Sequence, residues 1–250
     1  MSGNPLKILD LEIKSYGYKE ILAAIETNLI SKAYFSFSYV NAFIAVTTRQ
    51  NVSLRNDLAE FSALFSDGIG IYWASKFLYG KFGLKERING TDLYYKILDL
   101  AEKKSYGVFF FGGSESAAKS LESQLIQMYP KIMIKGVIAR NLCFEGEILN
   151  KISSSNSDIM FLGLGTPYQE KWIATFGKKT DIPIQIAVGS GIDFLSGTYK
   201  RAPKIIRNIG LEWLYRLFLE PKKLWKRYLL GIPHFLFLIV KQKLFDRESL

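Results

Sequence analysis

The sequence predicts an α/β fold, in which a mostly parallel sheet carries helices on both faces and a helical appendage follows at the C-terminus. Short apolar runs alternate with longer amphipathic runs of 3.6-residue periodicity, the pattern of parallel strands joined by helices. The predicted strands are almost continuously apolar, as in a sheet covered on both faces. No repeat or linker interrupts residues 1–195, so they form the predicted core and residues 196–250 the appendage.

In chain order, the predicted strands are residues 33–40, 106–113, 132–138, 158–165 and 182–191. The predicted helices are residues 19–30, 93–104, 116–129 and 168–177. Ligands of open α/β sheets bind outside the carboxyl ends of the strands, so the turns that follow the strands are the places to look for a site.

The appendage is helical, aromatic and basic between residues 210 and 245. Residues 200–250 hold 12 basic and 4 acidic side chains and therefore carry +8 of the formal net charge of +10. This charge fits a phosphate-bearing partner, which can be a nucleotide, a nucleic acid or an anionic membrane. Nucleic acid is disfavoured, because the charge lies in an aromatic, membrane-like segment without a recognisable nucleic-acid-binding motif.

The longest apolar stretch, residues 228–240, has 13 residues and includes Gly231, Pro233 and His234. It is shorter than the roughly 20 residues of a spanning helix, so it is expected to lie on a membrane at most. Cys143 is the only cysteine, and the opening MSGNPLKILD lacks a signal-peptide pattern. Both observations favour a cytoplasmic location.

Several chemistries are disfavoured by residues that the sequence lacks. A single histidine argues against a Ser-His-Asp mechanism and against a multi-histidine metal site. There is no Asp-x-Asp, no Walker A motif and no G-x-G-x-x-G after a strand. No metal and no cofactor are therefore predicted, and arginines or lysines would have to balance the charge of a leaving phosphate.

Two glycine-rich turns follow predicted strands. In FFFGGSES, Gly112 and Gly113 precede Ser114, a predicted N-cap, and form either a phosphate-binding turn or an ordinary βα turn. In GLGTPYQEKW, Thr166 and Gln169 have the spacing of a Thr-x-x-Gln capping box. The alternative is that Gln169 faces a ligand at the start of the helix.

Asp67 in LFSDGIGIYW lies between an apolar stretch and another expected helix. An Asp-Gly pair usually marks a turn or a cap, and the functional alternative is a general base at the mouth of the sheet. In the appendage, Lys222 and Lys226, and Lys223 and Arg227, are like charges four positions apart. Such pairs destabilise a helix unless an anion compensates, which favours an anionic surface over a solvated face.

Together these segments resemble the WecG/TagA/CpsF glycosyltransferases, glycosyltransferase family 26. The resemblance covers about residues 30 to 230 and is specific in combination rather than in any single motif. The matching pieces are Asn41 in SYVNAF, SDGIG at 66–70, ERINGTDL at 86–93, VFFFGG at 108–113, LGLGTPYQEKW at 162–172, VGSGIDFLSGTYKRAP at 188–203 and GLEWLYRLFLEPKKLWKRY at 210–228.

The resemblance implies a bacterial enzyme at the inner face of the cell membrane. Members transfer a sugar from a UDP-sugar to an undecaprenyl-diphosphate-linked sugar, with inversion and without a metal, for teichoic acid, enterobacterial common antigen or other surface polysaccharides. The implied fold is a Rossmann-like core, with an appendage that docks on the membrane and completes the active site.

The resemblance also implies roles for individual residues. Asp67 takes the general-base position. The implied substrate-binding residues are Asn41, Tyr39, Arg87, Gln169, Gly112, Gly113 and Asp193, of which the last three lie near the UDP. Tyr39 departs from the small hydroxyl residue expected there. The implied contacts to the lipid diphosphate and the membrane are Arg216, Lys223, Lys226 and Arg227, where both lysines replace a common arginine.

Two other functions stay open at this point. The same fold could serve a nucleotide-sugar enzyme with a soluble acceptor, or a nucleotide-binding membrane adaptor without turnover. The donor sugar is also open between N-acetylmannosamine, its uronic acid, glucose, mannose and other hexoses. The apolar appendage could also support a homo-oligomer when no membrane is present.

Overall fold

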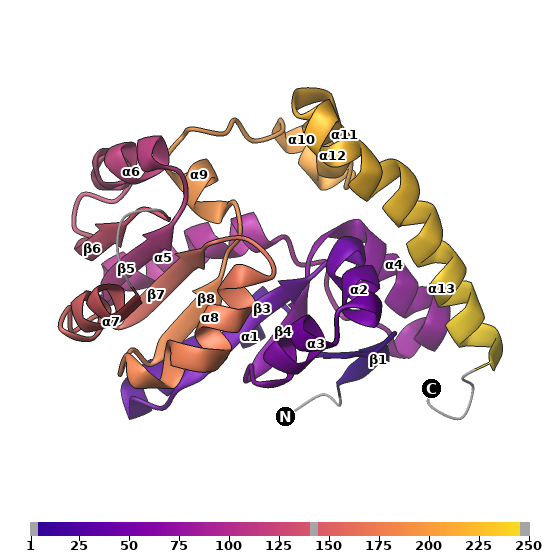
Figure 1. Ribbon diagram of the computed structural model, residues 1–250, viewed down its shortest axis with the longest axis horizontal. Helices are drawn as coiled ribbons and strands as arrows, with labels where there is room; N and C mark the ends of the chain where they lie inside the picture. The colour runs from indigo at the N-terminus through magenta and orange to yellow at the C-terminus, as the bar shows by residue number, and fades with distance from the viewer. Residues whose placement is uncertain (1–4, 141–144, 246–250) are drawn as a thin grey trace.

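The computed structural model describes residues 5–140 and 145–245, and Cys143 lies outside these ranges. A six-stranded, wholly parallel sheet runs through the core in the order β4-β3-β8-β7-β5-β6 (Figure 1). Its strands are β3 (Phe35–Val40), β4 (Ala63–Ser66), β5 (Gly107–Gly112), β6 (Met133–Ile138), β7 (Ile159–Gly163) and β8 (Ile184–Ala187). The predicted Rossmann-like α/β architecture is confirmed.

The central strands are apolar because both of their faces are covered. Every residue of β5, β7 and β8 is buried. In the register between β5 and β7, Phe110 pairs with Phe161, and their rings stack with centroids 5.1 Å apart. The carboxyl ends of these strands are thereby held at one edge of a rigid sheet, which is where the site lies.

The helices form two layers. One face of the sheet carries α1 (Tyr18–Ser31), α5 (Gly90–Lys104), α6 (Glu115–Met128) and α9 (Gly191–Leu195). The other face carries α2 (Ala42–Gln50), α3 (Val52–Ala59), α4 (Gly68–Tyr79), α7 (Glu145–Ser153) and α8 (Tyr168–Phe176). Two short 3-10 turns, η1 (Gly80–Phe82) and η2 (Gly177–Lys179), follow α4 and α8.

Each predicted strand contains an observed strand, and the four predicted helices correspond to α1, α5, α6 and α8. The sequence did not predict the antiparallel hairpin of β1 (Leu6–Ile8) and β2 (Leu11–Ile13), strand β4, or helices α2, α3, α7 and α9. All of these have nine residues or fewer. A short element gives few repeats of a hydrophobic pattern, so it is recognised from sequence less readily than a long one.

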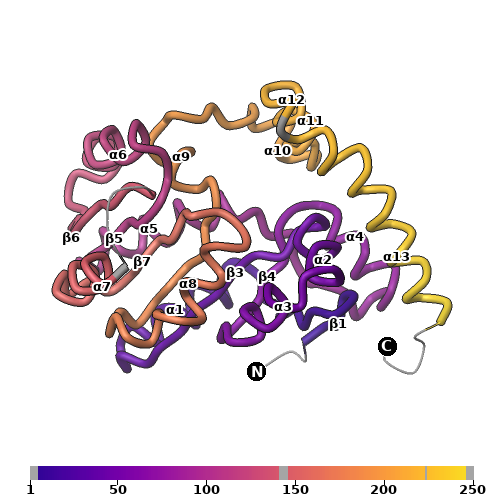
Figure 2. Tube along the Cα trace, viewed as in Figure 1, coloured from indigo at the N-terminus to yellow at the C-terminus, as the bar shows by residue number. Residues whose placement is uncertain are grey.

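We call residues 204–245 the tail. It consists of α10 (Lys204–Asn208), α11 (Glu212–Leu219), α12 (Pro221–Trp225), a π-helical turn η3 (Lys226–Leu230) and α13 (Gly231–Phe245). Figures 1 and 2 show α10 to α12 arching over the carboxyl ends of the strands, and α13 running down the side of the core.

The tail is anchored on the core by α13. Phe235 and Ile239 are 1% and 3% exposed and belong to the same hydrophobic cluster as α2 and α4. Gln242 Oε1 accepts a hydrogen bond from the Leu9 N–H at 2.9 Å, and its Nε2 donates to the Lys7 carbonyl at 3.0 Å. The first hairpin thus binds the last helix.

The apolar helix is longer than the 13-residue apolar stretch indicated. Residues 226–245 form 20 helical residues that are apolar enough to cross a membrane by length and composition alone. Pro233 does not end the helix, because a π-helical turn precedes it and a proline near the start of α13 lacks only an N–H donor. In this structure one side of α13 packs on the core and the other side is exposed, so it is a candidate membrane-docking element.

Candidate active site

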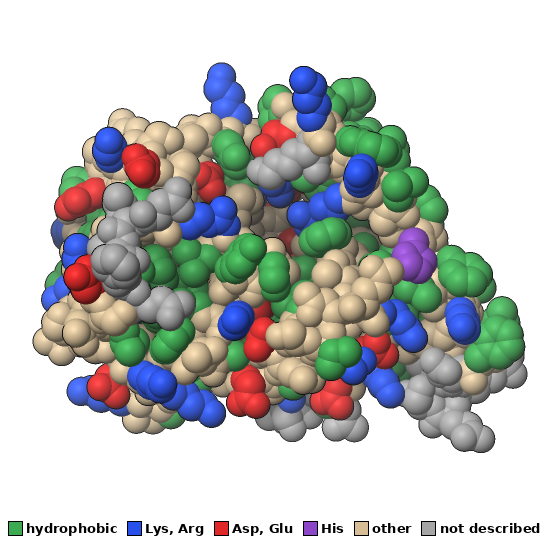
Figure 3. All heavy atoms as spheres, viewed as in Figure 1, with side chains coloured by type: hydrophobic (Ala, Val, Ile, Leu, Met, Phe, Trp, Pro, Cys, Tyr) green, Lys and Arg blue, Asp and Glu red, His purple; other side chains and the backbone are tan. Residues whose placement is uncertain are grey.

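A cavity of about 800 Å³ lies at the carboxyl ends of the strands, beneath the arch of the tail. Figure 3 shows the surface hollowed there, with charged side chains inside. The core supplies the turns after β3, β4, β5, β7 and β8, and the tail supplies residues from α11 to α13. The predicted catalytic and binding residues that line the cavity are Tyr39, Asn41, Asp67, Arg87, Gly113, Gln169, Asp193, Arg216 and Arg227.

Asp67 directly follows β4 and holds the N-cap position of α4, but its side chain does not cap the helix. Instead, its Oδ1 accepts a hydrogen bond of 3.0 Å from the Gly90 N–H. Burial raises the pKa of Asp67, the Gly90 bond opposes this, Glu212 raises the pKa further, and Arg227 and Arg216 lower it. The carboxylate is therefore fixed in place and binds a proton more readily than an ordinary aspartate, which suits a general base.

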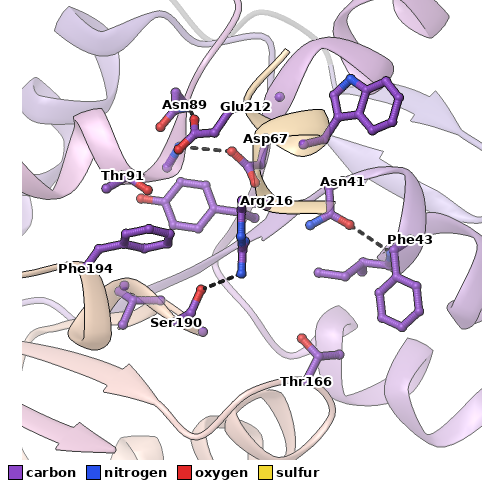
Figure 4. Close-up of a pocket in the computed structure, with 18 of the residues that line it drawn as sticks. Asn41, Phe43, Asp67, Asn89, Thr91, Thr166, Ser190, Phe194, Glu212 and Arg216 are labelled. Atoms are coloured by element: carbon purple, nitrogen blue, oxygen red, sulfur yellow. Dashed lines mark hydrogen bonds between the residues drawn. The ribbon is translucent and has the colours of Figure 1, made fainter. Parts of the chain in front are cut away.

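Strand β3 leads to Asn41 and carries Tyr39. The Oδ1 of Asn41 caps α2 by accepting from the Ile44 N–H at 3.1 Å, and Figure 4 shows its amide nitrogen on the cavity side. Tyr39 is 5% exposed, lies edge-on to Tyr94 at 5.5 Å, and its hydroxyl has no hydrogen-bond partner among the residues described. Burial raises the pKa of Tyr39 well above its usual value, so the hydroxyl keeps its proton and can donate to a ligand.

Gln169 does not form the capping box. Pro167 holds the N-cap position of α8 without a side-chain bond, and the Thr166 hydroxyl donates to Glu170 Oε1 at 3.0 Å instead of capping the backbone. The Oε1 of Gln169 accepts from the Gly189 N–H at 2.8 Å, and its Nε2 donates to Glu170 Oε1 at 2.8 Å. The amide of Gln169 is thus held from two sides at the wall of the cavity.

Glu170 is a buried carboxyl behind that wall. Its Oε1 also accepts from the Ser38 hydroxyl at 3.5 Å, and its Oε2 has no partner among the residues described. Burial raises the pKa of Glu170, and the hydrogen bond from Gln169 is the largest opposing influence. Glu170 does not line the cavity, so its contribution is to orient the Gln169 amide.

The two glycines at the end of β5 have different reasons to be glycine. Both have positive φ, 122° at Gly112 and 72° at Gly113. A Cβ on Gly112 would overlap the backbone of Gly163 on the neighbouring strand, and Gly112 does not line the cavity. Close packing of two strands therefore accounts for Gly112. Gly113 lines the cavity, but its N–H donates to the Gly163 carbonyl at 2.9 Å.

Ser114 is the N-cap of α6, as predicted, and its Oγ accepts from the Ala117 N–H at 3.1 Å. Asp193 lies beside this helix start. Its Oδ1 accepts from the N–H and the hydroxyl of Ser114 at 3.3 and 3.2 Å. An acidic side chain therefore already occupies part of the N-terminus that was considered for phosphate.

Core residues near Asp67 also hold the tail. Arg87 Nη2 donates to the Arg207 carbonyl at 3.0 Å, and Asn89 Nδ2 donates to Glu212 Oε2 at 2.7 Å. Arg87 thus lines the cavity and fastens the tail at the same time. Figure 4 shows Asn89, Glu212 and Asp67 close together at one end of the cavity.

Asp92, in the first turn of α5, makes a second link. Its Oδ1 lies 3.0 Å from Arg201 Nη2 and 2.8 Å from Arg207 Nη1. Arg201 also lies over the ring of Tyr95, 5.5 Å from its centroid. One carboxylate therefore holds two arginines at the junction of core and tail.

Two arginines of the tail enter the cavity. Arg216 Nη2 lies 3.5 Å from Ser190 Oγ, and its guanidinium is 5.4 Å from the ring centroid of Phe194 (Figure 4). The Arg227 guanidinium lies 4.5 Å from the ring centroid of Phe43, and its Nε has no hydrogen-bond partner among the residues described. Burial lowers the pKa of Arg227. An anion between these guanidinium groups would be bound by charge and by planar donors.

The two lysines differ from the arginines. Lys226 is exposed, does not line the cavity, and lies 5.6 Å from the ring centroid of Trp225. Lys223 is part of α12, but its side chain lies outside the described part of the structure. Within residues 5–140 and 145–245, no three His, Cys, Asp or Glu side chains are grouped so that they could hold a metal ion.

The sequence did not single out Asn89, Glu170, Ser190 or Glu212 as individual site residues. Asn89 precedes an amphipathic run and is the N-cap of α5, so a capping signal could have found it. The side chains of Ser190 and Glu212 contact residues more than 20 positions away, and so does Glu170 in its contact with Ser38. No local pattern reports such contacts.

The fold and the cavity define a class before any relative is considered: an α/β protein with a ligand site at the carboxyl ends of its strands, which contains Asp67 and arginines from both the core and the tail. Comparison with known proteins gives the class its name, glycosyltransferase. The profile of the family described as "Glycosyl transferase WecG/TagA/CpsF family" matches residues 6–249. The chain belongs to this family, as its motifs predicted.

Three curated relatives share the name N-acetylglucosaminyldiphosphoundecaprenol N-acetyl-beta-D-mannosaminyltransferase. The protein from Bacillus subtilis (strain 168) is 31% identical over 206 residues, 82% of this chain and 79% of the relative. That from Bacillus spizizenii is 30% identical over 241 residues, 96% and 90% of the two chains. That from Staphylococcus aureus (strain NCTC 8325 / PS 47) is 31% identical over 184 residues, 73% and 70%.

Proposed function

We propose that the protein moves a sugar from a UDP-sugar to an undecaprenyl-diphosphate-linked sugar, in the synthesis of a bacterial surface polysaccharide or teichoic acid. The observation that carries this proposal is the shared cavity, in which Asp67 from the core faces Arg216 and Arg227 from the tail. The relatives' name supports an N-acetylglucosamine acceptor on the lipid and an N-acetylmannosamine-type donor, with other hexoses as alternatives.

The proposed reaction is a single displacement with inversion. The acceptor hydroxyl oxygen attacks the anomeric carbon of the donor while the bond from that carbon to the UDP oxygen breaks. Asp67 takes the hydroxyl proton, and UDP leaves with the electron pair. The Gly90 N–H holds Oδ1 of Asp67, which leaves Oδ2 for the proton. The arginines stabilise the charge on UDP, in place of a metal.

The remaining polar groups of the cavity position the two sugars. The free hydroxyl of Tyr39, the amide nitrogen of Asn41 and the held amide of Gln169 are donors for sugar hydroxyl groups. Asp193 and Gly113 line the part of the cavity assigned to UDP. Alignment of both reactants in a closed space contributes to the rate beyond the acid–base step.

The tail is proposed to bind the anionic inner face of the cell membrane from the cytoplasm, as a peripheral element. Lys226, with Lys223, is assigned to lipid headgroups or to the carrier diphosphate, and the arginines of the cavity to the reacting phosphates. Residues 1–195 then act as the catalytic core and residues 196–250 as the docking unit that completes the active site.

The test is transfer to a synthetic short-chain prenyl-diphosphate-GlcNAc acceptor, with a panel of UDP- and GDP-sugars and EDTA, read by product mass. One lipid-linked disaccharide formed from a UDP-sugar would support the proposal and name the donor. A soluble acceptor that works equally well would favour a soluble-acceptor enzyme. UDP binding without product from any donor or lipid-linked acceptor would favour a non-catalytic adaptor.

A further inference from the structure

The core has an exposed apolar surface of its own beside the tail. Trp73 and Phe77 on α4 are 61% and 52% exposed, and Phe82 in η1 is 73% exposed. Trp73 and Phe77 are four positions apart and therefore share one face of the helix. None of them packs in either hydrophobic cluster of the core. Three large exposed aromatic side chains within ten residues indicate a binding surface rather than scattered exposure.

This surface lies directly beside α13. A Cβ on Gly70 would lie 4.0 Å from the ring of Phe235, and the Lys243 ammonium donates to the Leu78 carbonyl. Gly70 and Leu78 lie eight positions apart on α4, and their partners Phe235 and Lys243 lie eight positions apart on α13, in the same chain direction. The two helices therefore run parallel and in contact. Gly70, Trp73 and Phe77 follow one another on one face of α4, so the aromatic pair borders α13.

The neighbouring side of α13 is also apolar and exposed. Leu236, Val240 and Leu244 are 56%, 46% and 57% exposed and recur every four residues. Figure 3 shows hydrophobic side chains along the outer edge of the molecule over the tail. Leu236, Val240 and Lys243 lie on the same side of α13, since they are four and three positions apart. Because Lys243 contacts α4, the exposed apolar faces of the two helices lie next to each other.

The two segments that form this surface carry only positive charge. Residues 68–84 contain Lys76 and Lys81 and no Asp or Glu, and residues 221–245 likewise contain no Asp or Glu. Lys85, directly after the first segment, pairs with Glu20. Lys76 lies 5.6 Å from the ring centroid of Tyr72, and Lys81 lies 5.1 Å from that of Phe82. Aromatic side chains bordered by lysines match the interface of an anionic bilayer, where rings enter the headgroup region and ammonium groups meet lipid phosphates.

We propose that α4 and η1 of the core dock on the anionic membrane together with α13, through Trp73, Phe77 and Phe82 bordered by Lys76 and Lys81. This inference deepens the proposed docking of the tail and rests on it. Two parallel helices fix the rotation of the protein on the bilayer, which a single helix does not. Because Asp67 lies at the start of α4, the same contact sets the orientation of the active site to the lipid surface.

The test measures partition of the full-length protein onto vesicles of equal phosphatidylcholine and phosphatidylglycerol by co-sedimentation. The core variant is Trp73→Ser with Phe77→Ser, and the tail variant is Leu236→Ser with Val240→Ser. The control is Ile30→Ser with Ile126→Ser, on the helices of the opposite face, with parent side chains 74% and 48% exposed. We expect the core variant to lower the partition coefficient about tenfold, as loss of two apolar anchors should, and the control to leave it unchanged.

Two further readouts separate the possible failures. Vesicles of brominated lipid should quench the fluorescence of the wild type more than that of Trp73→Phe, since Trp73 would enter the bilayer. A core variant that partitions like the wild type, beside a weakened tail variant, would overturn the inference and leave tail docking intact. A core variant that loses only self-association in sedimentation velocity, without change on vesicles, would assign the surface to a second copy and overturn it too.

Discussion

The core and the tail contribute to the same cavity by different means. The core groups are fixed by short bonds to the backbone: Asp67 by the Gly90 N–H, Asn41 by the cap of α2, and Gln169 by the Gly189 N–H. The tail contributes Arg216 and Arg227, which lie on helices with few buried side chains and contact the core through ring faces and one bond of 3.5 Å.

In the proposed reaction, this difference separates two tasks. The core holds the group that must be aimed at a reacting hydroxyl, where small displacements are costly. The tail holds the charge that binds phosphate, which tolerates more freedom because Coulomb attraction has little directional demand. A site divided in this way can be complete only when the tail is in place, which links the reaction to the surface on which the tail docks.

The largest effect is expected from Asp67→Asn. The variant keeps an oxygen for the Gly90 N–H but cannot take a proton, so kcat should fall about 10²–10⁴-fold. The assay is transfer to the lipid-linked acceptor. Glu212→Gln is the matched control, because Glu212 is the nearby carboxylate from the tail and is held by Asn89. A larger loss in Glu212→Gln than in Asp67→Asn would assign the base to the tail.

The next largest effect is expected at Arg227, and it distinguishes this residue from its neighbour Lys226. Arg227→Met removes a guanidinium from the cavity and should lower kcat/KM about 10²-fold, the usual cost of one group that stabilises developing charge. Lys226→Met removes an exposed charge outside the cavity and should change kcat/KM only a few-fold, through membrane binding. UDP affinity by calorimetry should fall for the first variant alone. Equal losses in both would mean that the two cations act as one membrane patch.

A smaller effect on KM is expected from changes at Glu170, which lies behind the cavity wall. Glu170→Leu removes the acceptor that orients the Gln169 amide and should raise KM about tenfold. Glu170→Gln keeps an acceptor oxygen and should change KM little, which distinguishes orientation from simple packing. A similar rise in KM for both variants would contradict the positioning role.

The buried carboxyl of Glu170 also predicts that the stability of the protein depends on pH. Because the pKa of Glu170 is raised above 4.5 in the folded state, the folded protein binds this proton more tightly than the unfolded chain. As the pH rises from 4.5 through the pKa of the folded state, the buried carboxyl loses its proton and the free energy of unfolding falls. The Tm of Glu170→Gln relative to wild type should increase from pH 5 to pH 8, by thermal unfolding. A difference in Tm that does not vary with pH would contradict the raised pKa.

The smallest effect concerns the junction of core and tail. Asp92→Asn weakens the contacts to Arg201 and Arg207 and should raise the apparent KM roughly two- to fivefold, as partly exposed ion pairs contribute about 0.2–1 kcal/mol. Protease cleavage of the tail should become faster. Asp10 also pairs with two arginines, Arg49 and Arg55, but in the turn between β1 and β2 rather than at this junction. Asp10→Asn with the same effect on KM would show that the junction is not special.

The sequence predicted the parts that depend on local pattern. Buried strands appear as continuous apolar runs and long amphipathic helices as a 3.6-residue period, and the ends of the predicted strands indicate where Asn41 and Gly113 lie. It failed where contacts join distant segments. Gln242 binds a hairpin 233 residues away, and Asn89 binds Glu212 across 123 residues. The capping box failed because Glu170, the next residue, competes for both Thr166 and Gln169.

The central claim is that a core carboxylate and a tail cation act in one site, and the pH profile of kcat/KM tests it most directly. Activity should fall on the acid side with an apparent pKa above that of an ordinary aspartate, because burial favours protonated Asp67. A nearby cation favours the carboxylate, so Arg227→Met should raise the pKa of Asp67 and move the acid limb to higher pH. An acid limb that stays in place in Arg227→Met and persists in Asp67→Asn would contradict the account.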